Sequence, residues 1–105
     1  MSHRLDGVLA ALADPTRRSL FEALLARGPE TATNLAGGLP VTRQAVVKHL
    51  QVLADAGLLS SRRAGREVRY RAEPRGMDDV AAWMARSGAA WDRRLERLQQ
   101  RVDQR

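Results

Sequence analysis

Apolar residues recur three and four positions apart in several stretches of this chain, the spacing that places them on one face of a helix. Asp14, Thr31 and Thr42 stand where side chains cap the starts of three such stretches. A short helix after Thr31 is expected to hold Leu35 and Leu39. The other predicted helices cover about 4–13, 15–27, 43–56 and 75–103.

Between the last two of these helices the pattern becomes that of two strands. Residues 58–63 and 67–72 flank an Ala-Gly-Arg turn, and Val68, Tyr70 and Ala72 alternate with arginines. This predicts a hairpin with one apolar and one guanidinium face. Two short helices followed by a hairpin are typical of a winged helix-turn-helix. The predicted fold class is therefore mainly α with a small β-hairpin, comprising five helices and a two-stranded wing.

The length of the chain allows one domain of ordinary size. We expect residues 1–105 to form a single winged helix-turn-helix DNA-binding domain. Its predicted parts are a helix-turn-helix over 31–57, a wing over 58–73, and dimerisation helices over 1–13 and 75–105.

Positive charge is concentrated in the middle of the chain. The formal net charge is +6, and residues 42–75 hold eight basic side chains against three acidic ones. Of the 18 basic residues, only Lys48 is not an arginine. Arginine makes bidentate contacts to phosphate and to guanine, which lysine cannot. The clustering predicts a polyanionic partner, double-stranded DNA.

Composition excludes several classes of function. The absence of cysteine excludes disulfides, zinc–thiolate sites and thiol catalysis. The sequence shows no nucleophile–base pair and no Gly-rich phosphate loop, so we expect neither enzyme activity nor a cofactor. No apolar run approaches the roughly 18 residues of a membrane span, and no signal peptide is visible. We therefore expect a cytoplasmic protein with no membrane partner.

The outer face of the predicted 43–56 helix carries groups that can read DNA. A recognition helix contacts base edges from its N-terminal end. Arginine can bind guanine, glutamine can bind adenine, and the Val47 methyls can pack on a thymine methyl. The hairpin arginines are expected to contact phosphates and make binding salt-dependent. The predicted DNA-binding residues are Thr42, Arg43, Gln44, Val47, Lys48, Gln51, Arg62, Arg63, Arg66 and Arg69.

An apolar stripe with near-heptad spacing runs along the predicted last helix. Together with apolar residues of the first helix, it exposes more apolar surface than a soluble monomer usually shows. We therefore expect a homodimer. The predicted interface residues are Leu5, Val8, Leu9, Leu12, Trp83, Met84, Trp91, Leu95 and Leu98.

Three segments resemble the ArsR-type bacterial repressors: 11–18 (ALADPTRR), 42–50 (TRQAVVKHL) and 62–70 (RRAGREVRY). They occur in the family's order and, with the residues around them, cover about 11–73. The resemblance implies a homodimeric repressor whose first and last helices form the interface. It also implies that the helix beginning at Thr42 reads one half of an inverted-repeat operator.

The chain departs from the metal-sensing members of this family. Those members carry cysteines on the helix that corresponds to 31–38, or histidine and acidic ligands on the last helix. Here the segment 31–38 has Thr33 and Asn34 and no cysteine. The only histidines are His3 and His49, so the last helix has none. The resemblance is therefore to a cysteine-free subgroup without a metal site. The effector is left unidentified.

Several interpretations stay open on the sequence alone. The basic face could dock an acidic protein, as in a winged-helix interaction module. It could also bind duplex DNA without sequence preference, as a nucleoid-like protein does. His49 is either a packed structural residue or a phosphate contact. Arg17 and Arg18 are either helix-surface charges or phosphate contacts.

Overall fold

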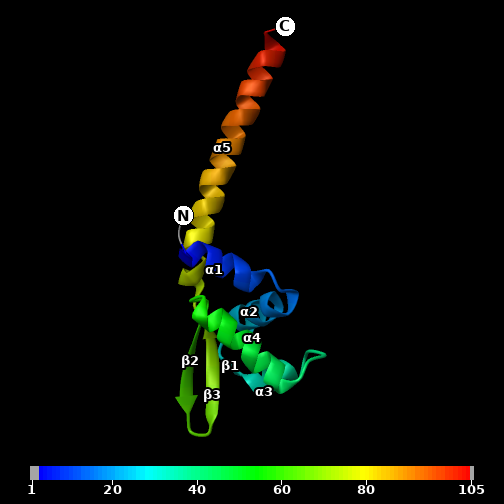
Figure 1. Cartoon of the computed structure of the whole chain (residues 1–105), viewed down its shortest axis with the longest axis vertical. Helices are drawn as coiled ribbons and strands as arrows, with labels where there is room; N and C mark the ends of the chain where they lie inside the picture. Colours follow the sequence, from blue (N-terminus) through cyan, green and yellow to red (C-terminus); the bar gives the residue numbers. More distant parts are fainter. Residues whose placement is uncertain (1–2, 105) are drawn as a thin grey trace.

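The computed structural model describes residues 3–104 and places them mainly in helices. Figure 1 shows a small body of helices and strands from which one long helix extends. The elements are α1 (His3–Leu12), α2 (Pro15–Arg27), β1 (Glu30–Thr31), α3 (Ala32–Ala36), α4 (Arg43–Asp55), β2 (Leu59–Ala64), β3 (Glu67–Ala72), the 3-10 helix η1 (Pro74–Met77) and α5 (Asp78–Asp103). The mainly helical fold class is confirmed.

The three predicted capping side chains are all in place. The Asp14 carboxylate accepts a hydrogen bond from the backbone N–H of Arg17 at 2.9 Å. The hydroxyls of Thr31 and Thr42 accept hydrogen bonds from the N–H groups three residues later, at 3.2 and 3.1 Å. Each cap satisfies one of the N–H groups that a helix start leaves without an intrahelical partner.

The sheet has three strands in the order β1–β3–β2, where the sequence predicts two. β1 is antiparallel to β3, and Thr31 lies opposite Arg69. A strand of two residues between Pro29 and a helix cap is too short to show an alternating pattern. Its pairing fastens the start of α3 to the wing.

Two helix boundaries also differ from the prediction. α3 ends at Ala36, so Leu39 lies outside it, although that side chain still packs against the core. Gly37 and Gly38 follow at once, and each glycine weakens a helix by about 1 kcal/mol relative to alanine. α5 begins at Asp78 because the preceding residues form the tighter turn of η1.

The inner face of α4 packs into the centre of the core. Val46, Leu50 and Leu53 are fully buried, in one cluster with Leu20 and Leu24 of α2. Complete burial of such a side chain is worth about 1.5–3 kcal/mol. This packing fixes which face of α4 is left to solvent.

α1 contributes its own apolar side chains to the same core. Leu5 and Val8 are 5% and 0% exposed, so the prediction that they lie on an open dimer face is wrong. Spacing shows that they share a helix face, but it does not show that α1 turns this face inward. Leu12 is partly buried against the core, whereas Leu9 stays 38% exposed.

Two arginines of α2 cap the C-terminal end of α1. Arg17 donates hydrogen bonds from Nε to the carbonyl of Ala11 (2.6 Å) and from Nη2 to that of Ala10 (3.2 Å). Arg18 Nη1 donates to the next two carbonyls at 2.7 and 3.1 Å. Carbonyls at a helix C-terminus lack intrahelical partners and carry partial negative charge, which cations stabilise. These contacts give both arginines a structural role that the sequence does not reveal.

α5 extends away from the body in the direction opposite to the wing (Figure 1). Val80 is the only residue of α5 that the described part of the chain buries. The radius of gyration is 18.8 Å, whereas a compact chain of this length has about 13 Å. Along residues 3–104, no helix combines the length and apolarity needed to cross a bilayer.

The start of α5 is joined to the end of α4 by a close backbone contact. A Cβ atom on Gly76 would lie 2.5 Å from the carbonyl oxygen of Gly57. Close by, the N–H of Glu73 donates a hydrogen bond to the carbonyl of Leu58 at 2.8 Å. A residue larger than glycine at position 76 would push these segments apart.

Replacing Arg17 by methionine removes the guanidinium while keeping an apolar stem. The carbonyl of Ala11 then loses the Arg17 donor, and that of Ala10 keeps only the N–H of Ala13, so Arg17→Met is expected to lower the free energy of unfolding by about 1–3 kcal/mol. Urea unfolding at a fixed protomer concentration measures this change. Arg27→Met is the matched control, because Arg27 is exposed and makes no side-chain hydrogen bond within residues 3–104. Equal stability of the two variants would contradict the capping role.

Candidate nucleic-acid interface

The face of α4 that points away from the core is polar and open. Thr42, Arg43, Gln44, Lys48 and Gln51 are exposed, and the Val47 side chain between them is partly exposed. All six predicted residues of this segment therefore lie on one accessible surface. Within residues 3–104, the side chains of Gln44 and Lys48 make no hydrogen bond.

The N-terminus of α4 combines helix-dipole charge with free donors. The Thr42 hydroxyl is already used as an acceptor by Ala45. The backbone N–H groups of Arg43 and Gln44 remain for an external acceptor, since the first N–H groups of a helix have no intrahelical partner. The partial positive charge there favours an anion such as a phosphate.

Two side chains of this surface are held by neighbours. Arg43 Nε donates a hydrogen bond to the Thr33 hydroxyl of α3 at 3.1 Å. Gln51 Nε2 donates to the Asp55 carboxylate, one turn further along α4, at 2.8 Å. The Arg43 side chain is therefore held by a residue of another helix, whereas the Gln51 side chain is held by a residue of its own helix.

The register of the wing divides the predicted arginines between two faces. Arg62 of β2 lies directly opposite Arg69 of β3, whereas Arg63 lies opposite Val68. Successive side chains of a strand point to opposite faces, so Arg71 joins Arg62 and Arg69 and Arg63 does not. The register agrees with the predicted alternation of arginines and apolar residues along β3, and it places Arg63 on the opposite face from Arg62. Arg71 was predicted to alternate with the apolar residues of this strand, but it was not among the predicted DNA-binding residues, although its spacing of two from Arg69 places it on the same face.

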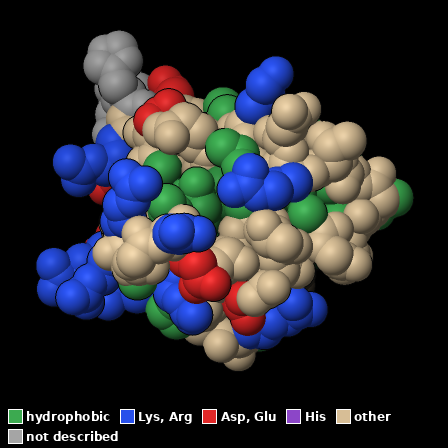
Figure 2. All heavy atoms as spheres, turned by 90° about the horizontal axis from the view of Figure 1, so that it is seen from below, with side chains coloured by type: hydrophobic (Ala, Val, Ile, Leu, Met, Phe, Trp, Pro, Cys, Tyr) green, Lys and Arg blue, Asp and Glu red, His purple; other side chains and the backbone are tan. Residues whose placement is uncertain are grey.

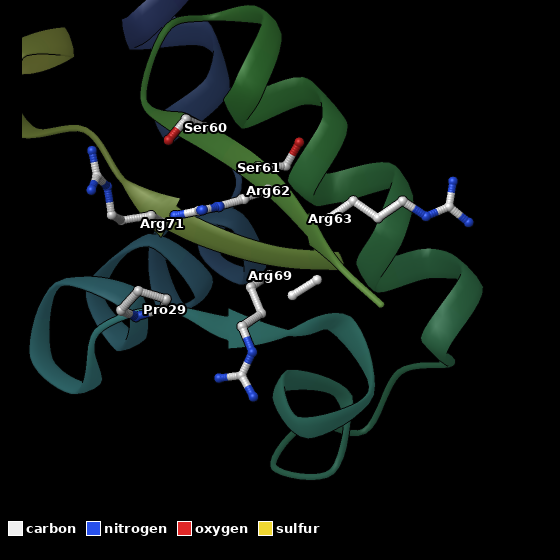
Figure 3. Close-up of a pocket in the computed structure, with 8 residues that line it drawn as sticks. Pro29, Ser60, Ser61, Arg62, Arg63, Arg69 and Arg71 are labelled. Atoms are coloured by element: carbon white, nitrogen blue, oxygen red, sulfur yellow. The ribbon is translucent and has the colours of Figure 1, made fainter. Parts of the chain in front are cut away.

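Arg62, Arg69 and Arg71 line a groove with a volume of about 650 Å³, together with Pro29 and residues 60, 61, 63 and 64 of β2. In Figure 3, Arg62 extends toward Arg71 and Arg63 points away from both. We call this surface the outer wing face. Tyr70 and Ala72, on the other side of the sheet, pack against the core.

Carboxylates pair with two of these three arginines. Arg69 and Glu67 are 3.3 Å apart, and Arg71 and Glu73 are 3.1 Å apart. The Ser60 hydroxyl donates a second hydrogen bond to Glu73 at 2.8 Å. The hydrogen bonds from Ser60 and Arg71 hold the pKa of Glu73 below its ordinary value of 4.5.

A second groove, of about 500 Å³, connects α4 to the wing. It is lined on one side by Thr33 and Asn34 of α3 and by Arg43 and Val47 of α4, and on the other by residues 66–70. Figure 2, which views the molecule from the wing end, shows Lys and Arg side chains at several places over the visible face. The exposed polar face of α4 and the turn that contains Arg66 therefore border the same groove.

The possible metal ligands of residues 3–104 lie apart from one another. His49 is partly buried on α4, beside the buried residues of its inner face. Across residues 3–104, no three His, Asp or Glu side chains gather where they could hold a metal ion.

The large apolar side chains of α5 are uncovered in the single chain. Trp83, Met84, Trp91, Leu95 and Leu98 are 39–60% exposed. Their pattern repeats after eleven residues, from Val80 to Trp91 to Val102. An eleven-residue repeat corresponds to 3.67 residues per turn, which keeps one face aligned along a nearly straight helix.

The fold and this surface define a winged helix-turn-helix protein of the DNA-binding type, and comparisons with known proteins agree. A family profile described as a helix-turn-helix domain matches residues 12–62. The HTH-type transcriptional regulator Rv2034 of Mycobacterium tuberculosis is 41% identical over 98 residues, which cover 93% of this chain and 88% of that protein.

Solved structures show the same relationship. An ArsR-like transcriptional regulator from Rhodococcus sp. RHA1 is 44% identical with a TM-score of 0.78, over 92% of this chain and 91% of that one. A homodimeric winged helix-turn-helix DNA-binding domain from Mycobacterium bovis is 27% identical with a TM-score of 0.62, over 85% and 79% of the two chains. The chain belongs to the ArsR-type family of winged helix-turn-helix transcriptional regulators.

The lowered pKa of Glu73, at the base of the wing, makes the stability of the fold depend on pH. A carboxyl whose folded pKa lies below 4.5 stabilises the fold above that pH, and this stabilisation is lost as the pH falls through the folded value. Ser60→Ala removes the largest cause of the shift. We expect Ser60→Ala to be less stable than wild type at neutral pH and the difference to shrink in acid. Urea midpoints measured across pH test this. A difference that is constant with pH would contradict it.

Proposed function

We propose that this protein is a sequence-specific transcriptional repressor that binds an inverted-repeat operator as a homodimer. The observation that carries the proposal is the open polar face of α4 from Thr42 to Gln51, directly beside a wing rich in arginine. A polar outer face is common on surface helices, so it is the combination with the neighbouring basic wing that favours a nucleic-acid partner. A helix that reads the major groove needs side chains of this kind.

The contacts divide into two kinds. Arg43, Gln44 and Val47 lie at the start of α4, from which recognition helices reach base edges, and they supply sequence preference. Thr42, Lys48 and Gln51 lie beside these three residues and contact the sugar–phosphate backbone of the DNA. The arginines of the wing neutralise phosphates, which adds affinity that falls with salt but adds no preference.

Dimerisation is supported by the uncovered stripe of α5. Five large apolar residues that are 39–60% exposed form a patch that soluble monomers rarely present. Leu9 of α1 adds to the candidate interface, whereas Leu5 and Val8 do not, since they lie in the core. A two-fold dimer places its two recognition helices about one DNA turn, or roughly 10 bp, or a multiple of it apart.

Among the possible regulatory outcomes, we propose repression, because it requires only that the protein bind its operator. A protein that occupies an operator can block transcription by occupancy alone. Activation needs a further surface that recruits the transcription machinery. We place the protein in the cytoplasm with the DNA that it binds, and the chemistry of any effector is left open.

Selection of bound fragments from genomic DNA tests this function. The proposal expects enrichment of one inverted repeat, tighter binding to it than to a scrambled duplex at physiological salt, and a dimer mass in sedimentation. Equal affinity for native and scrambled DNA would instead indicate a nucleoid-like binder. Binding to an acidic protein with no salt-sensitive DNA binding would indicate an interaction module.

The two kinds of contact predict different mutant behaviour. Arg43→Ala is expected to cost about 1–3 kcal/mol on the selected site and to relax one base position, because it removes a base contact. Arg66→Ala is expected to weaken all duplexes alike and to reduce the salt slope by about 1, because it removes a phosphate contact. Gel shifts over a salt series measure both effects, with Arg27→Ala as control. Indistinguishable behaviour of the two variants would contradict this division.

A further inference from the structure

A hydrogen bond from α3 holds the side chain of the first residue of α4. Arg43 Nε donates to the Thr33 hydroxyl at 3.1 Å, although the two residues are ten positions apart in the sequence. Both residues are exposed, so neither is needed to fill the core. The bond therefore acts on the exposed polar face of α4, where it fixes how one charged side chain is presented to solvent.

The short helix that carries Thr33 is held in place by other contacts. α3 has only five residues, which is too few for a helix that is stable by itself. Ala32 and Leu35, on either side of Thr33, are buried in the core. The Thr31 hydroxyl caps the start of α3, and Thr31 also pairs with Arg69 in the sheet. Core, cap and sheet together fix the position of Thr33 before any ligand is bound.

The atom that the Thr33 hydroxyl binds decides which edge of the Arg43 guanidinium is left for DNA. A guanidinium binds two acceptors at once either through Nε and one Nη group or through its two Nη groups. The Thr33 hydroxyl occupies Nε. Only the edge formed by the two Nη groups is left to bind O6 and N7 of a guanine together.

The place of this pair in the fold suits base recognition. Thr33 and Arg43 line the same groove between α4 and the wing. Arg43 stands at the first position of α4, the end from which recognition helices reach base edges. A free arginine side chain has many rotamers, and holding it near one of them reduces the conformational entropy that is lost when it binds.

We propose that Thr33 is a positioning residue that restricts Arg43 to reading guanine through its two Nη groups. The inference rests on the proposed function and adds the base that Arg43 prefers and the reason for it. The bond is exposed in the free protein, where water competes for both partners, and it strengthens when DNA excludes that water. The worth of one neutral hydrogen bond sets the expected effect on base preference at about two- to tenfold.

The test measures binding of the full chain to the selected operator and to duplexes changed at the one base position that Arg43→Ala relaxes. Thr33→Val keeps the shape of the side chain and removes the acceptor. It is expected to lose about two- to tenfold of the preference for guanine, with its salt slope and its affinity for scrambled DNA unchanged. Thr33→Ser retains a hydroxyl and is expected to keep the preference. Thr16→Val is the matched control, because the Thr16 side chain makes no hydrogen bond within residues 3–104.

Two further measurements separate positioning from a direct contact of Thr33 with DNA. In an Arg43→Ala background, Thr33→Val is expected to have no further effect, because Thr33 acts through Arg43 alone. In the free protein, the Arg43 Nε proton is expected to exchange with water faster in Thr33→Val than in wild type or Thr33→Ser. Equal exchange rates in all three proteins would overturn the inference without any reference to DNA.

The binding data distinguish this inference from the proposed function. Full preference for guanine in Thr33→Val would overturn the positioning role and leave the proposed function intact. Equal weakening on every duplex, or an effect that persists in the Arg43→Ala background, would also overturn the positioning role, since either result indicates that Thr33 contacts DNA itself. Absence of any sequence preference in wild type would overturn both.

Discussion

The packing of one side of α4 into the core is the constraint on which the rest of this structure depends. Val46, Leu50 and Leu53 face inward against α2, so residues on the opposite side of a regular helix must face outward. The same burial that stabilises the fold therefore presents the polar groups at the start of α4. Because the side chains come from a rigid helix rather than a loop, their relative positions are fixed before any ligand arrives.

The wing is fixed to this helix by the sheet. β3 is the central strand and pairs with β1 as well as β2, which connects the hairpin to the start of α3. The cross-strand register then decides which arginines share a face. Arg63 and Arg62 are adjacent in sequence but point to opposite faces of the sheet, so the charge of the wing is divided between two faces.

The sequence was sufficient for the features that depend on local spacing. The helices, their three capping side chains and the polar face of α4 all follow from residues within one or two turns of each other. Features that depend on tertiary contacts could not be predicted from the sequence. The burial of Leu5 and Val8 depends on where α1 docks, and β1 is too short for any pattern. The capping of α1 by Arg17 and Arg18 joins groups five to seven residues apart across a bend.

The close approach of Gly57 and Gly76 has a geometric consequence. It holds η1 against the turn that follows α4, directly before the point where α5 begins. Because α5 has 26 residues, a small change in its direction at this point becomes a large displacement at its far end. In an assembly held together along α5, the direction in which α5 leaves the body would therefore set the position of each α4.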